Sequence, residues 1–222
     1  EPQHLVGKNV ALSAFQTTLS LLAKGDLEFY YKVPWRSIHW KLTTKEKIPL
    51  DLGPEISVEF LGERERLGDR LQSGEIDAFF LPHPPTNVMS GAVQARRLFL
   101  DPELEEERYF SDAGFFPIMH VIAIHEALVH KNPQLPIQLM ELFHSAFDIA
   151  EGYYADPNWS MLPGCRHQYE RDRIRFSDRI WPRGFNANKE NIDMLMRYAV
   201  DQSIGAAYMP PEQLFADITL DT

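Results

Sequence analysis

Four short segments of the 222-residue sequence carry side chains that could bind or transform a small molecule. Gln16-Thr17-Thr18 opens an expected helix, where unsatisfied N–H groups and the positive dipole end favour a carboxylate or phosphate. His83 precedes two prolines, which fix the backbone and present the imidazole rigidly. His120 lies in an apolar stretch, and Arg183 follows Trp181, where a guanidinium beside an aromatic ring could clamp an anion.

Each of these side chains also has a structural interpretation. Thr17 or Thr18 could simply cap the helix, and His83 could lie in an exposed turn. A histidine such as His120, inside a buried strand, is more often a hydrogen-bonded core residue, and Arg183 could be an ordinary surface side chain. The residues alone therefore predict an α/β protein that binds a small anion, and they leave its chemistry open.

Other common catalytic patterns are absent from the sequence. It contains no Gly-x-Gly and no Gly-x-Ser-x-Gly, so a dinucleotide fingerprint, a phosphate loop and a hydrolase elbow are excluded. His120, His125 and His130 are spaced by five, which does not make them converge on a metal. Cys165 near His167 could form a nucleophile pair, although an inert thiol is expected without an activating environment. These patterns indicate no metal site and no cofactor, and a dependence on a metal stays open.

Composition limits the partners. Lys and Arg number 22 against 32 Asp and Glu, a net charge of −10, which repels nucleic acids and anionic membranes. No apolar run approaches the roughly 18 residues of a membrane span, so no membrane insertion is expected. One cysteine excludes an intrachain disulfide. With no visible signal peptide at Glu1–His4, we expect a cytoplasmic protein, and a periplasmic location stays open.

Strands and helices alternate in the expected secondary structure, and helices dominate the final third. The expected strands are 9–12, 38–42, 58–61, 76–81, an edge strand at 97–99 and the most apolar one at 117–124. The expected helices are 16–31, 64–72, 102–110, 134–154, 168–178, 189–202 and 211–215. A βαβ pattern followed by helices predicts an α/β fold with a mostly parallel sheet.

The same segments resemble one known family from about residue 5 to 216. The stretches that carry the resemblance are 5–11 with 16–18, 74–78 through 83–85, 97–99 with 101–102, Tyr109, 116–120, 181–184 with Asn188, 197–199 and 211–215. In them the sequence resembles the 4,5-dihydroxyphthalate decarboxylase-like proteins, which look like type II periplasmic binding proteins. The blocks Phe116-Pro117-Ile118-Met119-His120 and Trp181-Pro182 are its most specific parts.

The resemblance implies a two-lobed α/β fold with a ligand cleft between the lobes. Residues 5–114 would form the second lobe, and 115–222 the remainder of the first. Family members carry a further segment before the stretch that matches Leu5–Ala11. The sequence is therefore expected to be a fragment, or the missing half is supplied elsewhere, as in a homo-oligomer. An unpartnered half-lobe would expose a large apolar patch.

The resemblance also implies an activity, the release of CO2 from an aromatic dicarboxylate without a cofactor. His120 would be the catalytic acid or base, with apolar neighbours that keep its imidazole neutral. His83 would hydrogen-bond a hydroxyl or a carboxylate of the substrate. The other carboxylate would be bound by Gln16, Thr17, Thr18 and Arg183.

Two departures from the family pattern keep other functions open. His83 stands where the family usually has Arg, and Arg183 where it usually has Tyr. Both lie in expected pocket loops, so a changed substrate on a retained fold is one alternative. A second is a solute-binding protein of an ABC-type transporter, which would capture an anionic molecule and do no chemistry.

Overall fold

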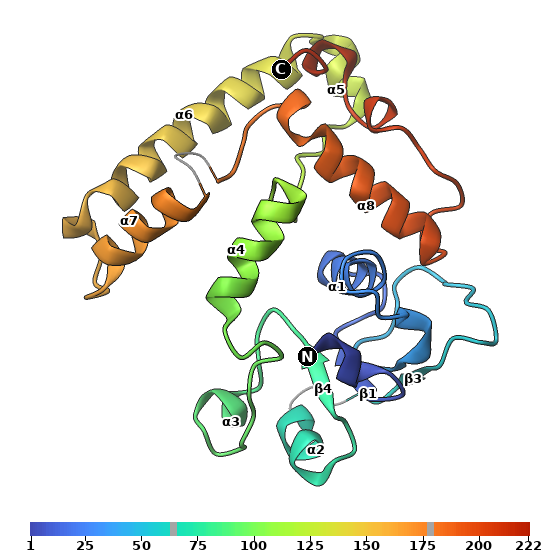
Figure 1. Cartoon of the computed structure of the whole chain (residues 1–222). Coiled ribbons are helices and arrows are strands. Elements are labelled where there is room, and N and C mark those ends of the chain that lie inside the picture. The colour runs from blue at the N-terminus through green and yellow to red at the C-terminus, as the bar shows by residue number, and fades with distance from the viewer. Residues whose placement is uncertain (63–65, 177–179) are drawn as a thin grey trace. The chain divides into compact units, whose positions relative to one another are not determined.

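The computed structural model describes residues 1–62, 66–176 and 180–222 (Figure 1). Contacts within the chain define two compact units. Unit 1 comprises Glu1–Pro102 and Met194–Tyr208, and unit 2 comprises Glu103–Asp193 and Met209–Thr222. The chain therefore enters unit 1 twice, and helix α8 (Lys189–Asp201) contributes to both units.

Unit 1 is built on a four-stranded, fully parallel sheet in the order β3-β2-β1-β4. Its strands are β1 (Asn9–Leu12), β2 (His39–Leu42), β3 (Val58–Phe60) and β4 (Ala78–Phe80). In this register Leu12 pairs with Leu42 on one side and with Phe80 on the other. The prediction of a parallel sheet in an α/β arrangement is confirmed.

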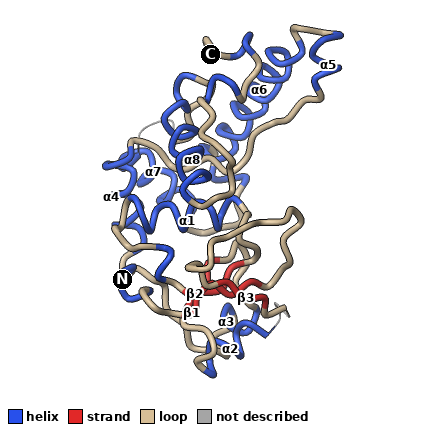
Figure 2. The backbone as a smooth tube through the Cα atoms, turned by 90° about the vertical axis from the view of Figure 1, so that its right-hand side faces the viewer, coloured by secondary structure: helices blue, strands red, loops and turns tan. Residues whose placement is uncertain are grey.

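Helices cover both faces of this sheet, as the two views agree (Figures 1 and 2). Successive side chains of a strand point to opposite faces. Leu12 accordingly belongs to a large apolar cluster that includes Leu27 of α1 (Thr18–Phe29). Ala11 belongs to a second cluster, to which α2 (Leu67–Ser73) contributes. The central strand β1 is buried on both faces, which is why its sequence is continuously apolar after Asn9.

The order of the strands reverses beside β1. From β1 the chain proceeds through α1 to β2 and then to β3, on one side of the sheet centre. It then returns through α2 and adds β4 on the other side of β1. The carboxyl ends of β1 and β4 therefore form a topological switch point, the place where open α/β sheets bind ligands.

The second entry of the chain into unit 1 packs residues of α8 against α1. Tyr198 lies in a buried cluster with Leu21, and the Gln202 side-chain amide donates to the Leu21 carbonyl at 2.8 Å. A Cβ at Gly25 would overlap the Tyr198 ring, so the absence of a side chain there lets the ring lie against the helix. Residues near position 200 thus complete the core built by the first thirty.

Unit 2 consists of helices and irregular segments in its described residues. The helices are α4 (Pro102–Ala113), α5 (Glu126–Lys131), α6 (Leu135–Ala155), α7 (Cys165–Phe176) and the first part of α8. Short 3-10 turns lie at Pro157–Trp159, Asn186–Asn188, Pro211–Gln213 and Asp217–Thr219. Unit 1 also contains α3 (Thr86–Met89) and the 3-10 turns Pro2–Leu5 and Trp35–Ser37.

Three predicted elements are wrong. Residues 97–99 and 117–124 form no strand, and the helix expected at 211–215 is only the turn Pro211–Gln213. A strand exists only with a hydrogen-bonded neighbour, and all described strands lie in the sheet of unit 1. The parts of the expected helices 64–72 and 168–178 that fall on 64–65 and 177–178 lie outside the described residues.

Unit 2 exposes many apolar side chains on α6, its longest helix. The exposed members on this helix are Leu142, Phe143, Phe147, Ile149, Tyr153 and Tyr154. Met119, Val121 and Ile122 of the irregular segment before α5 are exposed as well. Within the described ranges, neither α6 nor any other helix has the length and apolarity to cross a membrane.

Candidate functional site

Two loops of unit 1 leave the switch point side by side in the sheet, and we call them the switch-point loops. The first, 13–17, follows β1, and the second, 81–85, follows β4. Because Leu12 pairs with Phe80 in parallel register, both loops begin at the same edge of the sheet. The structure thus brings the expected binding residues 16–18 and the expected catalytic His83 to one edge. Their convergence on one pocket stays a prediction.

Thr17 is the N-cap of α1, so its capping interpretation is correct. Its Oγ1 accepts the Ser20 N–H at 3.3 Å and lies 2.8 Å from the Ser20 hydroxyl. Thr18 is the first residue of the helix. The first N–H groups of a helix have no carbonyl acceptor within that helix. The Thr17 side chain accepts the N–H of Ser20. The N–H groups of Thr18 and Leu19 therefore remain directed to an acceptor outside the helix, and an anion suits them.

Gln16 is oriented by the segment that follows β2. Its side-chain amide donates to the Ile48 carbonyl at 2.7 Å, and the residue is half-buried. The same segment binds the backbone of the first switch-point loop, because Thr44 N–H donates to the Ser13 carbonyl at 2.8 Å and the Glu46 carboxylate accepts the Phe15 N–H. The loop that carries Gln16 is therefore held by a neighbouring loop of the same edge.

Lys24 of α1 holds this loop from the other side, and the sequence analysis missed it. Its side chain is fully buried and its Nζ donates to the Phe15 carbonyl at 2.9 Å. Loss of water around the ammonium lowers the pKa of Lys24 to about 6, against the attraction of Glu46, which raises it. One signal was available, because Lys24 lies three residues from both Leu21 and Leu27, on the apolar face of the helix.

His83 is exposed, in the turn between β4 and α3. Pro82, Pro84 and Pro85 surround it, and Pro85 is the N-cap position of α3. The imidazole is thus carried by a stiff segment at the switch point, as the spacing of the prolines predicts.

His120 lies in unit 2, in the irregular segment 116–125, and it is exposed. The interpretation as a core histidine and the expectation of an apolar surrounding are therefore both wrong. The segment is fixed two residues earlier by Asn191 of α8, which is 2% exposed. Its Oδ1 accepts the Ile118 N–H at 3.2 Å and its Nδ2 donates to the Phe116 carbonyl at 2.7 Å. Asn191 was also missed, since a lone asparagine in a helix has no distinguishing pattern.

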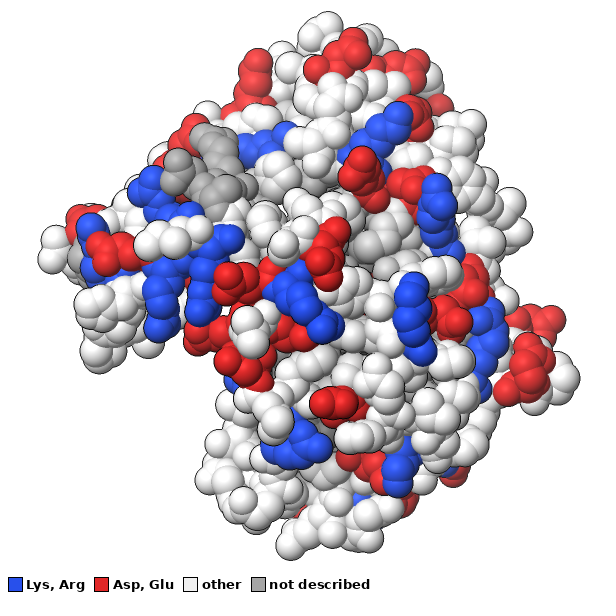
Figure 3. Space-filling model, in the orientation of Figure 1, with Lys and Arg blue, Asp and Glu red and all other residues white. Residues whose placement is uncertain are grey.

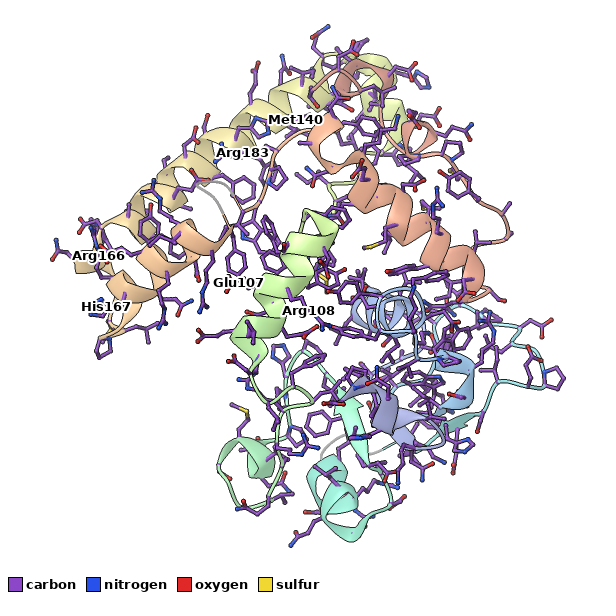
Figure 4. All side chains as sticks on the ribbon, in the orientation of Figure 1. Glu107, Arg108, Met140, Arg166, His167 and Arg183 are labelled. Carbon is purple, nitrogen blue, oxygen red and sulfur yellow. The ribbon has the colours of Figure 1, made fainter. Side chains whose placement is uncertain are left out.

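Arg183 joins the segment after α7 to helix α6 (Figure 4). Its guanidinium donates to Asp148 at 2.7 Å, to Glu151 at 3.0 Å and to the His144 carbonyl at 3.1 Å. The hydrogen bond that Arg183 donates to Asp148, with the charges of both carboxylates, raises the pKa of Arg183 above its usual value. Arg183 already binds two carboxylates of the protein, so a substrate carboxylate would replace one of them.

The segments of His120 and Arg183 meet through their aromatic residues. The rings of Phe116 and Trp181 lie 5.6 Å apart, and Phe110 and Phe176 complete the cluster. The structure thus brings the Phe-Pro-Ile-Met-His and Trp-Pro-Arg-Gly blocks together within unit 2. His83 and the segment 16–18 belong to unit 1.

Two other histidines of the sequence analysis, His125 and His130, have structural positions. His125 caps α5 by accepting the Ala127 N–H, and His130 pairs with Glu126 one turn away. Cys165 and His167 lie two positions apart at the start of α7, a spacing that points them to different sides of the helix. Among the described residues, no three His, Cys, Asp or Glu side chains gather closely enough to hold a metal ion.

Acidic and basic side chains are interspersed over the surface, as the face in Figure 3 shows. In unit 2, Arg175 of α7 pairs with Glu103 at 3.0 Å and Glu107 at 3.4 Å, both on α4. With a net charge of −10, the long-range field of the chain opposes an anionic ligand. A site for such a ligand must therefore rely on local donors, which the amino end of α1 provides.

No family model matches the sequence. The chain is similar to the 4,5-dihydroxyphthalate decarboxylase of Comamonas testosteroni. The two are 26% identical over 229 aligned residues, which include all of this chain and 69% of the relative. Similarity along the entire chain supports a distant relationship, and the two-lobed fold of periplasmic binding proteins stays a prediction.

Proposed function

We propose that this protein is a carboxy-lyase that releases CO2 from an aromatic dicarboxylate of the 4,5-dihydroxyphthalate type, without a redox or pyridoxal cofactor. The observation that carries the proposal is the similarity, over the whole chain, to a protein named for that reaction. The position of the segment 16–18 and of His83 at the switch point of the sheet adds support.

The reaction breaks one bond between the ring and a carboxylate. The bonding electron pair stays with the ring carbon, CO2 leaves, and a proton takes its place on that carbon. Deprotonation of the ring hydroxyl para to this carbon pushes electron density toward it, so a base at the hydroxyl and an acid at the carbon both lower the barrier. The dicarboxylate dianion and one proton become the monocarboxylate anion and CO2.

Residues of unit 1 bind the carboxylate that the product keeps. The N–H groups of Thr18 and Leu19, together with the side chain of Gln16, offer donors at the positive end of α1. The Thr17 hydroxyl would join them by leaving its present acceptor, the Ala14 carbonyl at 3.3 Å. His83 hydrogen-bonds a ring hydroxyl or a carboxylate. Fixed donors of this kind orient the ring and need no reorganisation during the reaction.

In this proposal, the proton exchange is assigned to His120 of unit 2, since an imidazole can act as acid or base near neutral pH. Arg183 contributes positive charge for a carboxylate, in exchange for Asp148 or Glu151. Both residues stand on segments fixed by Asn191 and by the aromatic cluster around Phe116.

Incubation of the protein with 4,5-dihydroxyphthalate tests the proposal. We expect one CO2 and one monoacid for each diacid consumed, without an added cofactor. Phthalate is the matched control substrate, because it lacks the hydroxyl that feeds electrons into the ring, and it should bind without releasing CO2. Tight binding of 4,5-dihydroxyphthalate with no release of CO2 would overturn the proposal in favour of a solute-binding protein.

A further inference from the structure

Lys24 is a charged residue type at a position without solvent exposure. Its Nζ lies over the Phe15 ring and 5.7 Å from the centre of the Trp35 ring, so aromatic surfaces surround much of it. An amine removed from water is costly unless it is hydrogen-bonded. An apolar side chain of the same length would fill this space without that cost, so the stability of the core does not account for a lysine here.

The hydrogen bonds of Phe15 indicate what the amine does. Lys24 Nζ donates to the Phe15 carbonyl, and the Glu46 carboxylate accepts the Phe15 N–H. The two polar groups of one residue are therefore held from two different elements, α1 and the segment after β2. Phe15 directly precedes Gln16-Thr17-Thr18, so fixing its backbone fixes the direction in which the chain enters the helix.

We propose that Lys24 is a positioning residue of the switch-point site, whose amine holds the Phe15 carbonyl so that the turn 16–18 presents its donors to a carboxylate of the substrate. The substrate part of this inference rests on the proposed function. The positioning part concerns the protein without a ligand and stands on the contacts of Lys24 and Glu46.

The charges around Lys24 make this role sensitive to pH. Burial lowers its pKa to about 6, so the amine is mostly an uncharged donor near neutral pH, while Glu46 from the segment after β2 favours the charged form. The third element beside Lys24 is the 3-10 turn Trp35–Ser37. The Arg36 guanidinium lies over the Trp35 ring, and the Trp35 indole N–H donates to Asp201, which also forms an ion pair with Arg36. A carboxylate bound at the turn 16–18 adds negative charge nearby and raises the pKa of Lys24. Binding then takes up a proton, and affinity falls as the pH rises above about 6.

Hydrogen exchange on the full chain without ligand tests the positioning. Lys24→Met keeps the length of the side chain and removes the donor. We expect the Phe15 amide, whose N–H the Glu46 carboxylate accepts, to exchange about tenfold faster or more, while the amides of β2 keep their rates. Lys32→Met is the matched control, because Lys32 also donates to a main-chain carbonyl, that of Phe29, at the exposed end of the same helix. In Lys32→Met, the amides at 15–18 should exchange at the rates of the unmodified protein.

Unchanged exchange of the Phe15 amide in Lys24→Met, or quickening spread evenly over the sheet, would overturn the proposal, since the lysine would then only fill space. Should Lys24→Met fail to fold, Glu46→Ala is the second variant, because it removes the acceptor of the Phe15 N–H. It should give the same exchange pattern. Glu46→Gln retains an acceptor for the Phe15 N–H and should restore slow exchange.

Kinetics with 4,5-dihydroxyphthalate test the link to the site. In Lys24→Met we expect KM to rise about tenfold with kcat changed less than about threefold. The increase of KM with pH above about 6 should become flatter than in the unmodified protein. A changed exchange pattern with no turnover in any variant would retain the positioning role and reject the proposed reaction. A changed exchange pattern with KM and its pH profile unaltered would reject the link to the substrate.

Discussion

The two units of the chain differ in how much of their apolar surface is covered. In unit 1, Leu12 and Trp40 have no exposed surface, because helices cover both faces of the sheet. In unit 2, Leu142 and Ile149 of α6 are 64% and 60% exposed. Apolar residues stabilise a fold in proportion to the area they remove from water. Unit 1 therefore supplies more stabilisation through its core than the described part of unit 2 does.

The units also differ in how they fix their polar side chains. Unit 1 holds its first switch-point loop through the buried Lys24 and through backbone bonds of Thr43 and Thr44. Unit 2 fixes Arg183 through carboxylates that are 60% and 50% exposed. Water and salt weaken such surface pairs. Unit 1 thus fixes its first switch-point loop through buried groups, and unit 2 carries exposed residues, His120 among them, that can change without damage to a core.

The largest expected effect is a difference in stability loss between substitutions of two tryptophans. Trp40 is fully buried and donates from Nε1 to the Trp35 carbonyl at 3.0 Å, whereas Trp159 of unit 2 is 70% exposed and contacts Tyr153. Trp40→Ala should lower the free energy of unfolding by about 3–5 kcal/mol. Trp159→Ala should lower it by about 1 kcal/mol or less. Urea denaturation measures both, and equal losses would mean that unit 2 has a covered core in solution.

A smaller effect, on activity alone, is expected at His120. Gln in place of His120 keeps much of the volume and removes the exchangeable proton, so turnover of 4,5-dihydroxyphthalate should fall roughly 100-fold or more. Because His120 is exposed, the melting temperature and the affinity for the diacid should change little. Turnover within a few-fold of the unmodified protein would assign the proton transfer to another residue.

The third effect is a pH dependence of the free energy of unfolding that arises from Lys24 of unit 1. Folding lowers the pKa of Lys24 from an unfolded value near 10.4 to about 6, so the unfolded chain binds one more proton between these values. The free energy of unfolding should therefore rise with pH by about 1.4 kcal/mol per pH unit relative to Lys24→Met. Urea denaturation between about pH 7 and pH 9 measures the difference. A difference independent of pH would mean that Lys24 stays charged when buried.

The smallest effect is expected on α6. Leu142→Gln replaces an apolar side chain that is 64% exposed, and it should change the free energy of unfolding by about 0.5 kcal/mol or less. Leu27→Gln on α1, where the leucine is 3% exposed, is the contrasting variant and should cost several times more. A loss at Leu142 as large as that at Leu27 would reveal that the apolar face of α6 is covered in solution.

The fold was predictable from the sequence where neighbouring elements lie close along the chain. The expected strand 9–12 has the bounds of β1, and the helix expected at 16–31 contains α1. The segment 117–124 is as apolar as a strand but finds no hydrogen-bonded neighbour in the described residues. Composition indicates that a segment can form a strand, and the presence of a partner decides whether it does.

The candidate site was predictable in part for the same reason. Loops after strands are visible in the sequence, so Thr17 and His83 could be predicted as site residues. The register of β1 with β4 brings their loops to one edge, and their roles in binding stay predictions. The partners of Arg183 lie more than thirty residues away on α6, and the Phe15–Lys24 bond depends on how the chain turns into α1. Such contacts arise from tertiary packing, which no local pattern specifies.

The close contact between Gly25 and Tyr198 has a consequence for synthesis on the ribosome. The face of α1 that Tyr198 covers is made early, and its cover emerges only after residues 103–193 of unit 2 have been translated. At about 5–20 residues per second, the roughly 170 residues from Leu27 to Tyr198 take about 9–35 s. During this interval the nascent chain displays Leu21 and Leu22 uncovered, so translation speed through unit 2 sets how long chaperones have a binding site on unit 1.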